Sequence, residues 1–191
     1  MKTKNISSPR IIILLFVICA LSFFSGIFIS HYFYFVPESD PFTEQALSQD
    51  LSGPYRLARV VDGDTLIIKI DDVDERVRLI GVDTPESVHP DSFRNSPEGI
   101  EASDFVKSVL GGSSVFLEYD ISERDRYDRL LAYVYFENGS ELVMLNSYLL
   151  QNGIARISTY PPNVKHVVLF TENQNFAIDN LLGFWESGFY G

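Results

Sequence analysis

An uncharged apolar run near the N-terminus constrains the fold of this chain more than any other feature. Residues 11–29 read IIILLFVICALSFFSGIFI. As a helix, this run rises about 28 Å, which is close to the thickness of the hydrocarbon core of a bilayer. Three basic residues and no acid precede it, whereas acidic residues follow from Glu38 onward. The positive-inside rule then places residues 1–10 in the cytoplasm and the rest of the chain outside.

Two interpretations of this run remain open. We predict an uncleaved, single-pass signal-anchor over residues 11–36, with a cell-membrane location, followed by a linker over residues 37–54 that is rich in Pro, Ser, Asp and Gly. The alternative is a protein secreted after cleavage of a signal peptide. The run is longer than a usual signal-peptide core, and no clear small-x-small cleavage site follows it, which favours the anchor.

The charge of the remaining chain excludes some functions. The whole chain has 15 basic and 26 acidic residues, and three of the basic residues lie before residue 37, so residues 37–191 carry 12 basic and 26 acidic residues. Such a body repels polyanions at long range and is not a protein that coats nucleic acid generically. The single cysteine, Cys19, excludes an intrachain disulfide and a cysteine-based zinc site.

Residues 55–191 show strand and helix signals that indicate one α+β domain. Strands are predicted at residues 55–61, 66–70, 76–82, 115–119 and 130–136, with an Asp-Gly turn joining the first two. A first helix is predicted from Ser96-Pro97 to Gly111-Gly112. A second helix has Leu142, Leu145 and Leu149 on one face and ends at Asn152-Gly153, and a third spans about 164–182. A helix between the third and fourth of five strands matches the five-stranded Greek-key barrel called the OB-fold, although other small α+β folds fit this count.

The turn between the first two predicted strands carries two acidic residues, and the third predicted strand contains an arginine among apolar residues. Asp62 and Asp64 flank a turn glycine, a pattern that suits either an ordinary hairpin or a site for a hard metal ion. Arg78 interrupts an apolar strand, and its guanidinium needs an anionic partner there. A structural acid at the strand edge would satisfy this need as well as a substrate would.

The third strand ends in a second group of polar residues. Asp83 and Glu86 bracket Thr84-Pro85, and the proline keeps Thr84 extended, which aims a carboxylate and a carbonyl at one point. Asp64 reaches the same point if the meander brings the strands together. Further along, residues 126–129 read RYDR and lead directly into a strand. This segment is either a solvated polar turn or a turn that aims a second guanidinium at the site.

Three motifs together resemble the staphylococcal nuclease (thermonuclease) family: VVDGDTL, RLIGVDTPE and RYDRLLAYVY, in this order. The resemblance covers residues 55–185 and indicates a membrane-anchored homologue. It implies an OB-fold barrel with three α-helices, Ca²⁺ as cofactor, and hydrolysis of phosphodiester bonds in DNA and RNA by a monomeric body. Two alternatives to an enzyme fit the same chain. The first is a non-catalytic module that binds nucleic acid or protein, which also occurs on this fold. The second is a structural calcium-binding protein of the cell surface. Retention of the acids and arginines argues against the non-catalytic module, and the calcium-binding surface protein remains an open alternative.

The resemblance also implies residue roles, which we take from the motif positions. It assigns calcium binding to Asp64, Asp83 and the Thr84 carbonyl, a place near the metal to Asp62, catalysis to Arg78, Glu86 and Arg129, and substrate contacts to Arg126 and Tyr127. Tyr160 is the candidate to stack on a base. Asp128 occupies a position where the family often has glycine and could compete for Arg129. We interpret His89 and His166 as surface residues and not as metal ligands.

Overall fold

The structure is a computed structural model that describes residues 51–88 and 95–191. The predicted segments at residues 1–10 and 11–36 lie outside the described residues, as does most of the predicted linker. Among the described helices, none combines the length and the apolar composition that a membrane span needs. The described chain belongs to one compact unit, Leu47–Gly191.

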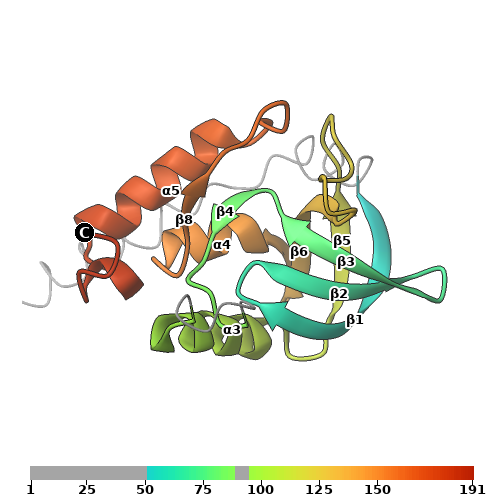
Figure 1. The fold of residues 1–191 in the computed structure, drawn as a ribbon, viewed down its shortest axis with the longest axis horizontal. Helices are drawn as coiled ribbons and strands as arrows, with labels where there is room; N and C mark the ends of the chain where they lie inside the picture. The colour runs from blue at the N-terminus through green and yellow to red at the C-terminus, as the bar shows by residue number, and fades with distance from the viewer. Residues whose placement is uncertain (1–50, 89–94) are drawn as a thin grey trace, which may run out of the picture. The chain divides into compact units, whose positions relative to one another are not determined.

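Five strands form a closed barrel: β1 (Ser52–Asp62), β2 (Thr65–Ile70), β3 (Val73–Leu79), β5 (Ser114–Glu118) and β6 (Leu130–Asn138). Their order is β3-β2-β1-β5-β6, and a parallel pairing between β3 and β6 closes the cylinder (Figure 1). This arrangement, with three helices, confirms the predicted OB-fold. The first strand begins at Ser52 and not at Tyr55, within the segment that the sequence assigned to the linker.

Alternation of side chains along the strands fills the barrel and decides what faces outward. Leu66 and Ile68 of β2, and Val77 and Leu79 of β3, are at most 1% exposed and belong to the core. Successive residues of a strand point to opposite faces. The intervening positions of β2 and β3, which include Arg78, therefore lie on the outside of the barrel.

The first helix forms as its local signals predict. Helix α3 (Pro97–Leu110) is capped by Ser96, whose Oγ accepts a hydrogen bond from the Gly99 N–H at 3.1 Å. Pro97 occupies the first turn, where its missing N–H costs nothing. Gly111 ends the helix in the left-handed conformation, with φ of 47°.

The two later helices are shorter than predicted. Helix α4 (Leu145–Gln151) begins after Leu142, which lies in the short strand β7 (Glu141–Met144), because the chain turns back at residues 138–140 and pairs with β6. Helix α5 (Val167–Asp179) begins after the predicted residue 164. The preceding residues instead bond to the loop after β5: Asn163 Oδ1 accepts from the Ser122 N–H at 2.8 Å.

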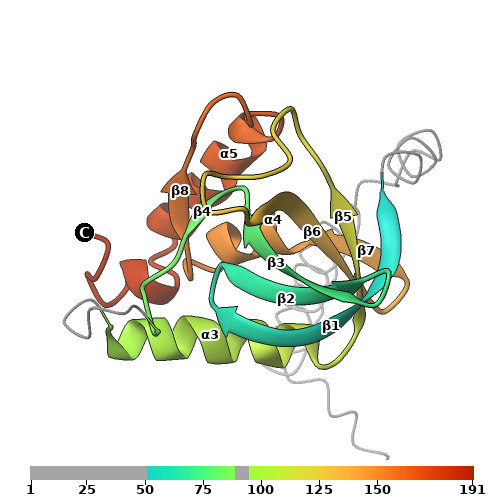
Figure 2. The same cartoon turned by 45° about the vertical axis from the view of Figure 1, so that its right-hand side comes forward.

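A second, two-stranded sheet lies beside the barrel, and the sequence patterns did not reveal it. Strand β4 (Gly81–Asp83) pairs antiparallel with β8 (Arg156–Ser158), under helix α5 (Figure 2). Gly81 turns the chain out of β3 with φ of 77°, and a Cβ there would lie 2.5 Å from the Phe170 ring. The third predicted strand therefore ends at Leu79, and a separate strand carries Asp83.

Candidate active site

The turn between β1 and β2 is bonded to the segment that follows β4. Asp64 Oδ2 accepts a hydrogen bond from the Thr84 N–H at 3.1 Å, and Asp62 Oδ1 accepts one from Ser87 Oγ at 2.8 Å. Gly63 allows this approach, because a Cβ at that position would lie 2.7 Å from Thr84 Oγ1. Two acidic segments that lie 20 residues apart in the sequence are thus held together.

Two carboxylates meet at one guanidinium nitrogen. Arg78 Nη2 lies 3.0 Å from Asp64 Oδ2 and 3.3 Å from Asp83 Oδ1. Arg78 Nη1 donates to the carbonyls of Leu79 and Val82, at 2.8 and 2.7 Å. The guanidinium is therefore fixed on both sides, and the acids of the first turn and of β4 converge on the same point.

The donor set at this point fits a hard divalent cation. Burial raises the pKa of the Asp64 carboxyl above its ordinary value, although the charge of Arg78 and the Thr84 N–H act in the opposite direction. A nearby cation would favour the ionised carboxylate. Asp64, Asp83 and the Thr84 carbonyl offer the oxygen ligands that Ca²⁺ and Mg²⁺ prefer. No cluster of three or more His, Cys, Asp or Glu side chains with metal-binding geometry occurs within residues 51–88 and 95–191.

Glu86 is held beside this turn by helix α3. Its carbonyl accepts a hydrogen bond from the Ser96 N–H at 2.9 Å. Gly99, in the first turn of the helix, packs directly on the same peptide: a Cβ there would lie 2.1 Å from the Glu86 carbonyl oxygen. The sequence analysis did not single out Gly99, although a glycine inside a helix is a signal of close backbone approach.

The second arginine is oriented by an acid that the sequence analysis missed. Asp125 Oδ2 accepts from Arg129 Nε at 2.7 Å, and Asp125 Oδ1 accepts from the N–H groups of Tyr127 and Arg129 at 2.9 and 3.0 Å. Burial acts to raise the pKa of Asp125, but these hydrogen bonds outweigh it and lower the pKa. The spacing of four residues between Asp125 and Arg129 is the feature of the sequence that could have indicated this pair.

Asp128 does not compete for Arg129. Its side chain is 88% exposed and lies 3.7 Å from Arg124 Nη1. Its backbone adopts φ of 62°, in the left-handed region, which explains why glycine suits this position. The suggestion that Asp128 binds Arg129 is therefore wrong, because the turn directs the two side chains to different partners.

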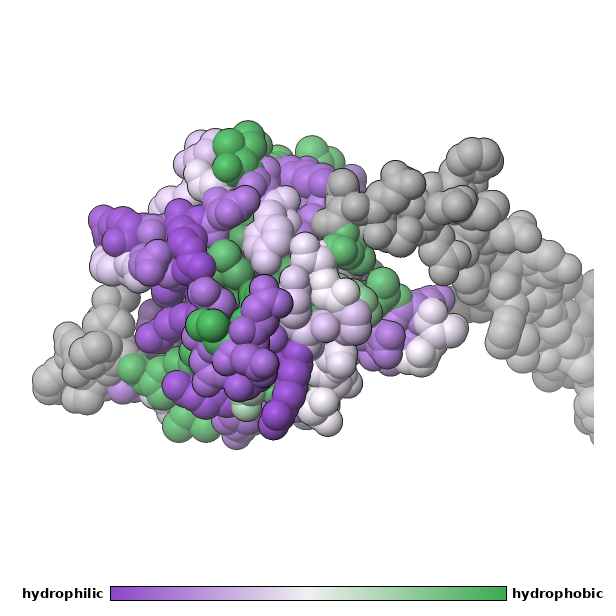
Figure 3. All heavy atoms as spheres, turned by 90° about the vertical axis from the view of Figure 1, so that its right-hand side faces the viewer, coloured by the Kyte–Doolittle hydropathy of each residue, from purple (hydrophilic) through white to green (hydrophobic). Residues whose placement is uncertain are grey.

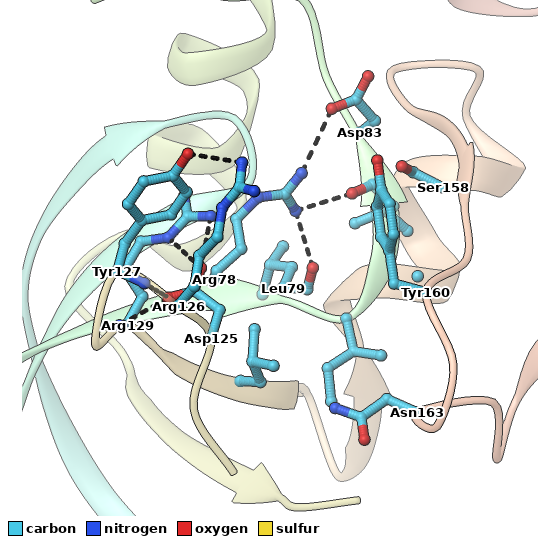
Figure 4. A pocket seen from close by; sticks show the side chains of 14 residues that line it. Arg78, Leu79, Asp83, Asp125, Arg126, Tyr127, Arg129, Ser158, Tyr160 and Asn163 are labelled. Carbon is cyan, nitrogen blue, oxygen red and sulfur yellow. Dashed lines mark hydrogen bonds and ion pairs between the residues drawn. The ribbon is translucent and has the colours of Figure 1, made fainter. Parts of the chain in front are cut away.

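Arg78, Asp83, Asp125 and Arg129 border one cavity of about 490 Å³. Figure 4 shows Arg126, Tyr127 and Arg129 on one side of the cavity with Arg78 next to them, and Asp83 and Tyr160 on the opposite side. The Arg126 guanidinium lies over the Tyr127 ring, 4.7 Å from its centroid. The volume is in the range of small-ligand pockets, and three guanidiniums face it.

The structure brings most of the predicted residues to this cavity. The lining includes Arg78, Asp83, Arg126, Tyr127, Arg129 and Tyr160. Asp62, Asp64 and Thr84 are buried in the bonded turn behind Arg78, and Glu86 is not part of the lining. Arg156 is a further residue that the sequence analysis missed: its Nη2 lies 3.1 Å from Asp83 Oδ2, and its strand, β8, was not predicted.

The sequence is similar to known nucleases. The family model described as "Staphylococcal nuclease homologue" matches residues 76–187. A thermonuclease of Staphylococcus intermedius is 44% identical over 155 residues, which covers 81% of this chain and 88% of that protein. A thermonuclease of Staphylococcus hyicus is 46% identical over 132 residues, 69% of this chain and 75% of that protein. Endonuclease YncB of Bacillus subtilis is 35% identical over 136 residues, 70% of this chain and 62% of that protein.

Proposed function

The chain belongs to the staphylococcal nuclease family and is a nuclease, and from this premise we propose that it hydrolyses phosphodiester bonds of both DNA and RNA in a calcium-dependent reaction outside the cytoplasmic membrane. One observation carries the proposal. The carboxylates of Asp64 and Asp83 meet at Arg78, and Arg129 borders the same cavity.

The two arginines bind the reacting phosphate. A phosphodiester is anionic, and attack by water adds further negative charge to the phosphoryl oxygens. Arg78 and Arg129 both line the cavity, and their guanidiniums place positive charge where such charge develops. Asp125 keeps the Arg129 guanidinium oriented through contacts of 2.7 Å.

Glu86 orients the attacking water and accepts its proton. The two backbone contacts from helix α3 hold its peptide next to the acidic turn. Asp64, Asp83 and the Thr84 carbonyl would hold the calcium ion, with Asp62 close by. When bound, the ion supplies positive charge next to the phosphate and helps to position the water.

The remaining pocket residues bind the nucleotide. Arg126 and Tyr127 contact a terminal phosphate, since their polar groups lie together at the rim, with Arg126 Nη2 donating to the Tyr127 hydroxyl at 2.7 Å. Tyr160 is 76% exposed and borders the cavity, a position from which its ring stacks on a base.

A digest with and without free calcium tests the metal. We expect the full-length chain in detergent to cleave plasmid DNA and a single-stranded RNA with Ca²⁺, to lose both activities in a chelator, and to regain them when Ca²⁺ is restored. Asp64→Asn should need far more Ca²⁺ for half-maximal rate, whereas Glu141→Gln, which is exposed on β7, should not. Undiminished cleavage in the chelator would contradict the calcium requirement.

We also propose that residues 11–36 anchor a monomeric catalytic body to the outer face of the cytoplasmic membrane. The uncharged run and its basic N-terminal flank support this. Activity should sediment with membranes of an expressing bacterium, and intact cells should degrade added DNA as fast as lysed cells. Activity that appears only after lysis, or only in the culture medium, would contradict the anchor or its orientation.

A further inference from the structure

A row of arginines lies on the outer face of the barrel, next to the pocket. In the sheet register, Arg59 of β1 is opposite Ile67 of β2, and Ile67 is opposite Arg76 of β3. Residues opposite each other share a face of the sheet, and residues two apart on one strand do too. Arg76 therefore lies on the same outer face as Arg78, about 7 Å further along β3.

A bulge adds a further arginine to this face. Arg56 is opposite Lys69 and Arg59 is opposite Ile67, so three steps on β1 correspond to two steps on β2. Ala58 is the extra residue. In a regular strand, residues 56 and 59 would point to opposite faces, whereas the bulge turns both outward.

Arg56, Arg59 and Arg76 have no acidic partner among the described residues, in contrast to most of the other basic residues that the structure describes. Among the described residues, acids lie within 4 Å of seven basic side chains: Lys69, Arg78, Lys107, Arg124, Arg129, Arg156 and Lys165. In the same part of the chain, no such contact occurs for Arg56, Arg59, Arg76 or Arg126. The first three are exposed and share this face, and the fourth borders the pocket.

Acidic residues bound this face on one side. The turn between β2 and β3 carries Asp71 and Asp72, and Asp74, at the start of β3 on the same face as Arg76, pairs with Lys69 at 3.9 Å. Figure 3 looks toward this end of the hairpin, and hydrophilic residues gather there. The acids make the hairpin tip unfavourable for a polyanion, whereas Arg59 lies across β2 from Arg76.

We propose that Arg76, Arg59 and Arg56 form an arginine track that binds the phosphate backbone of the substrate strand beyond the cleavage pocket. The track rests on the proposed function and extends it from one phosphodiester to several nucleotides. Strands β3 and β1 are separated by β2, so Arg76 and Arg59 are about 10 Å apart at the backbone, a distance that two long side chains and consecutive phosphates span. On a body with a large acidic excess, unpaired guanidiniums on the face of the active site are placed for a polyanion.

Salt dependence of binding tests the track without catalysis. In chelator, a labelled single-stranded oligonucleotide long enough to cover β1–β3 is titrated with the full-length wild type, with Arg59→Gln/Arg76→Gln, and with Lys107→Glu. The control changes the net charge by the same amount on helix α3, where Lys107 pairs with Asp104. The slope of log Kd against log salt should fall by about 1.4 in the double variant and not in the control, because each phosphate that is no longer neutralised removes roughly 0.7.

Kinetics give a second readout. With Ca²⁺ at low salt, the double variant should show a KM for the long strand raised by roughly tenfold, while its kcat and its rate on a mononucleotide ester that ends within the pocket stay at the wild-type values. An unchanged salt slope and an unchanged KM would overturn the track. Equal loss on the mononucleotide ester would also overturn it, because the variant would then have damaged the pocket.

Two further outcomes separate this proposal from others. If the wild type cleaves no nucleic acid with any divalent cation, the proposed function fails, and the binding slopes still decide the track. If the double variant loses binding to vesicles of anionic lipid but keeps the oligonucleotide slope, this face serves a membrane surface and the track is wrong.

Discussion

Arg78 and Arg129 are fixed by different kinds of partner, and this difference matters for what each can do. Arg78 contacts two carboxylates and two backbone carbonyls, so its position is built into the β3–β4 junction. Arg129 depends on Asp125 alone among the described acids. Substrate phosphate therefore meets one guanidinium held by the fold and one held by a single side chain.

Loss of either arginine should lower kcat at least as much as loss of Glu86. Stabilisation of developing charge is usually the larger contribution to catalysis, and assistance by a general base is worth roughly 100-fold or more. We expect Arg78→Ala and Arg129→Ala each to reduce the initial rate of DNA cleavage by about 100-fold or more, measured beside Glu86→Gln at saturating Ca²⁺. Unfolding curves of the three variants, compared with that of the wild type, serve as the control for a folding defect. Full activity of either arginine variant would contradict the assignment.

Asp128 predicts a stability difference that depends only on its backbone. At φ of 62°, glycine has no steric penalty, whereas alanine has one of about 1 kcal/mol. Asp128→Gly should therefore be more stable than Asp128→Ala by about 1 kcal/mol in urea unfolding. Since both variants remove the same exposed carboxylate, charge cancels from the comparison. Equal stability of the two would show that the turn relaxes to another conformation.

The sequence motifs indicated which residues lie close together in the fold, but they did not indicate partners that come from other segments. Of the motif residues, Arg78, Asp83, Arg126 and Arg129 line the pocket, and Asp64 lies in the turn that is bonded to Thr84. Arg156 was missed because its contact with Asp83 exists only through the pairing of β8 with β4. Asp125 and Gly99 were missed because their importance lies in what they touch and not in their residue type.

At the scale of elements, local capping signals predicted α3, whereas tertiary pairing created β4 and β8. Ser96, Pro97 and Gly111 mark the ends of α3 in the sequence. The two short strands have three residues each, too few for a period of two to be visible. They form because Gly81 turns the chain out of β3, which ends at Leu79, and the residues that follow pair with a segment after α4.

The contact between α3 and Glu86 predicts a coupled effect of Gly99→Ala. The added methyl group would overlap the Glu86 carbonyl, and a backbone atom cannot rotate away as a side chain does. We expect a loss of about 1–3 kcal/mol of unfolding free energy and a lower kcat, since the helix must shift away from the Glu86 peptide.

The matched control is Glu101→Ala, an exposed position on the same helix. It should leave kcat unchanged and stability within about 0.5 kcal/mol. Unfolding and initial-rate measurements on both variants decide the question. A Gly99→Ala enzyme with wild-type stability and rate would show that α3 does not position Glu86.

At the scale of the molecule, a buried carboxylate connects the barrel to the C-terminal helix. Glu118 of β5 is 2% exposed and accepts a hydrogen bond from the Tyr135 hydroxyl of β6 at 2.6 Å. Its oxygens also lie 2.5 Å from Lys165 Nζ and 2.9 Å from His166 Nε2, just before α5. The interpretation of His166 as a surface residue is therefore wrong: its ring is 18% exposed and packs on Tyr133. The sequence could not show this, because the partners come from three separate segments.

This cluster predicts how stability depends on acid. Burial acts to raise the pKa of Glu118, but hydrogen bonds from His166, Lys165 and Tyr135 outweigh it and lower the pKa from 4.5 to about 2. A carboxyl whose pKa is lowered on folding stabilises the folded state above pH 4.5, and this contribution is lost as the pH falls toward 2. Glu118→Gln should therefore be less stable than wild type by about 2 kcal/mol at pH 7, and the difference should shrink between pH 5 and pH 2. Urea unfolding at intervals across this range measures it, with the exposed Glu141→Gln as the control. A difference that stays constant with pH would mean that Glu118 contributes through its shape and not through its charge.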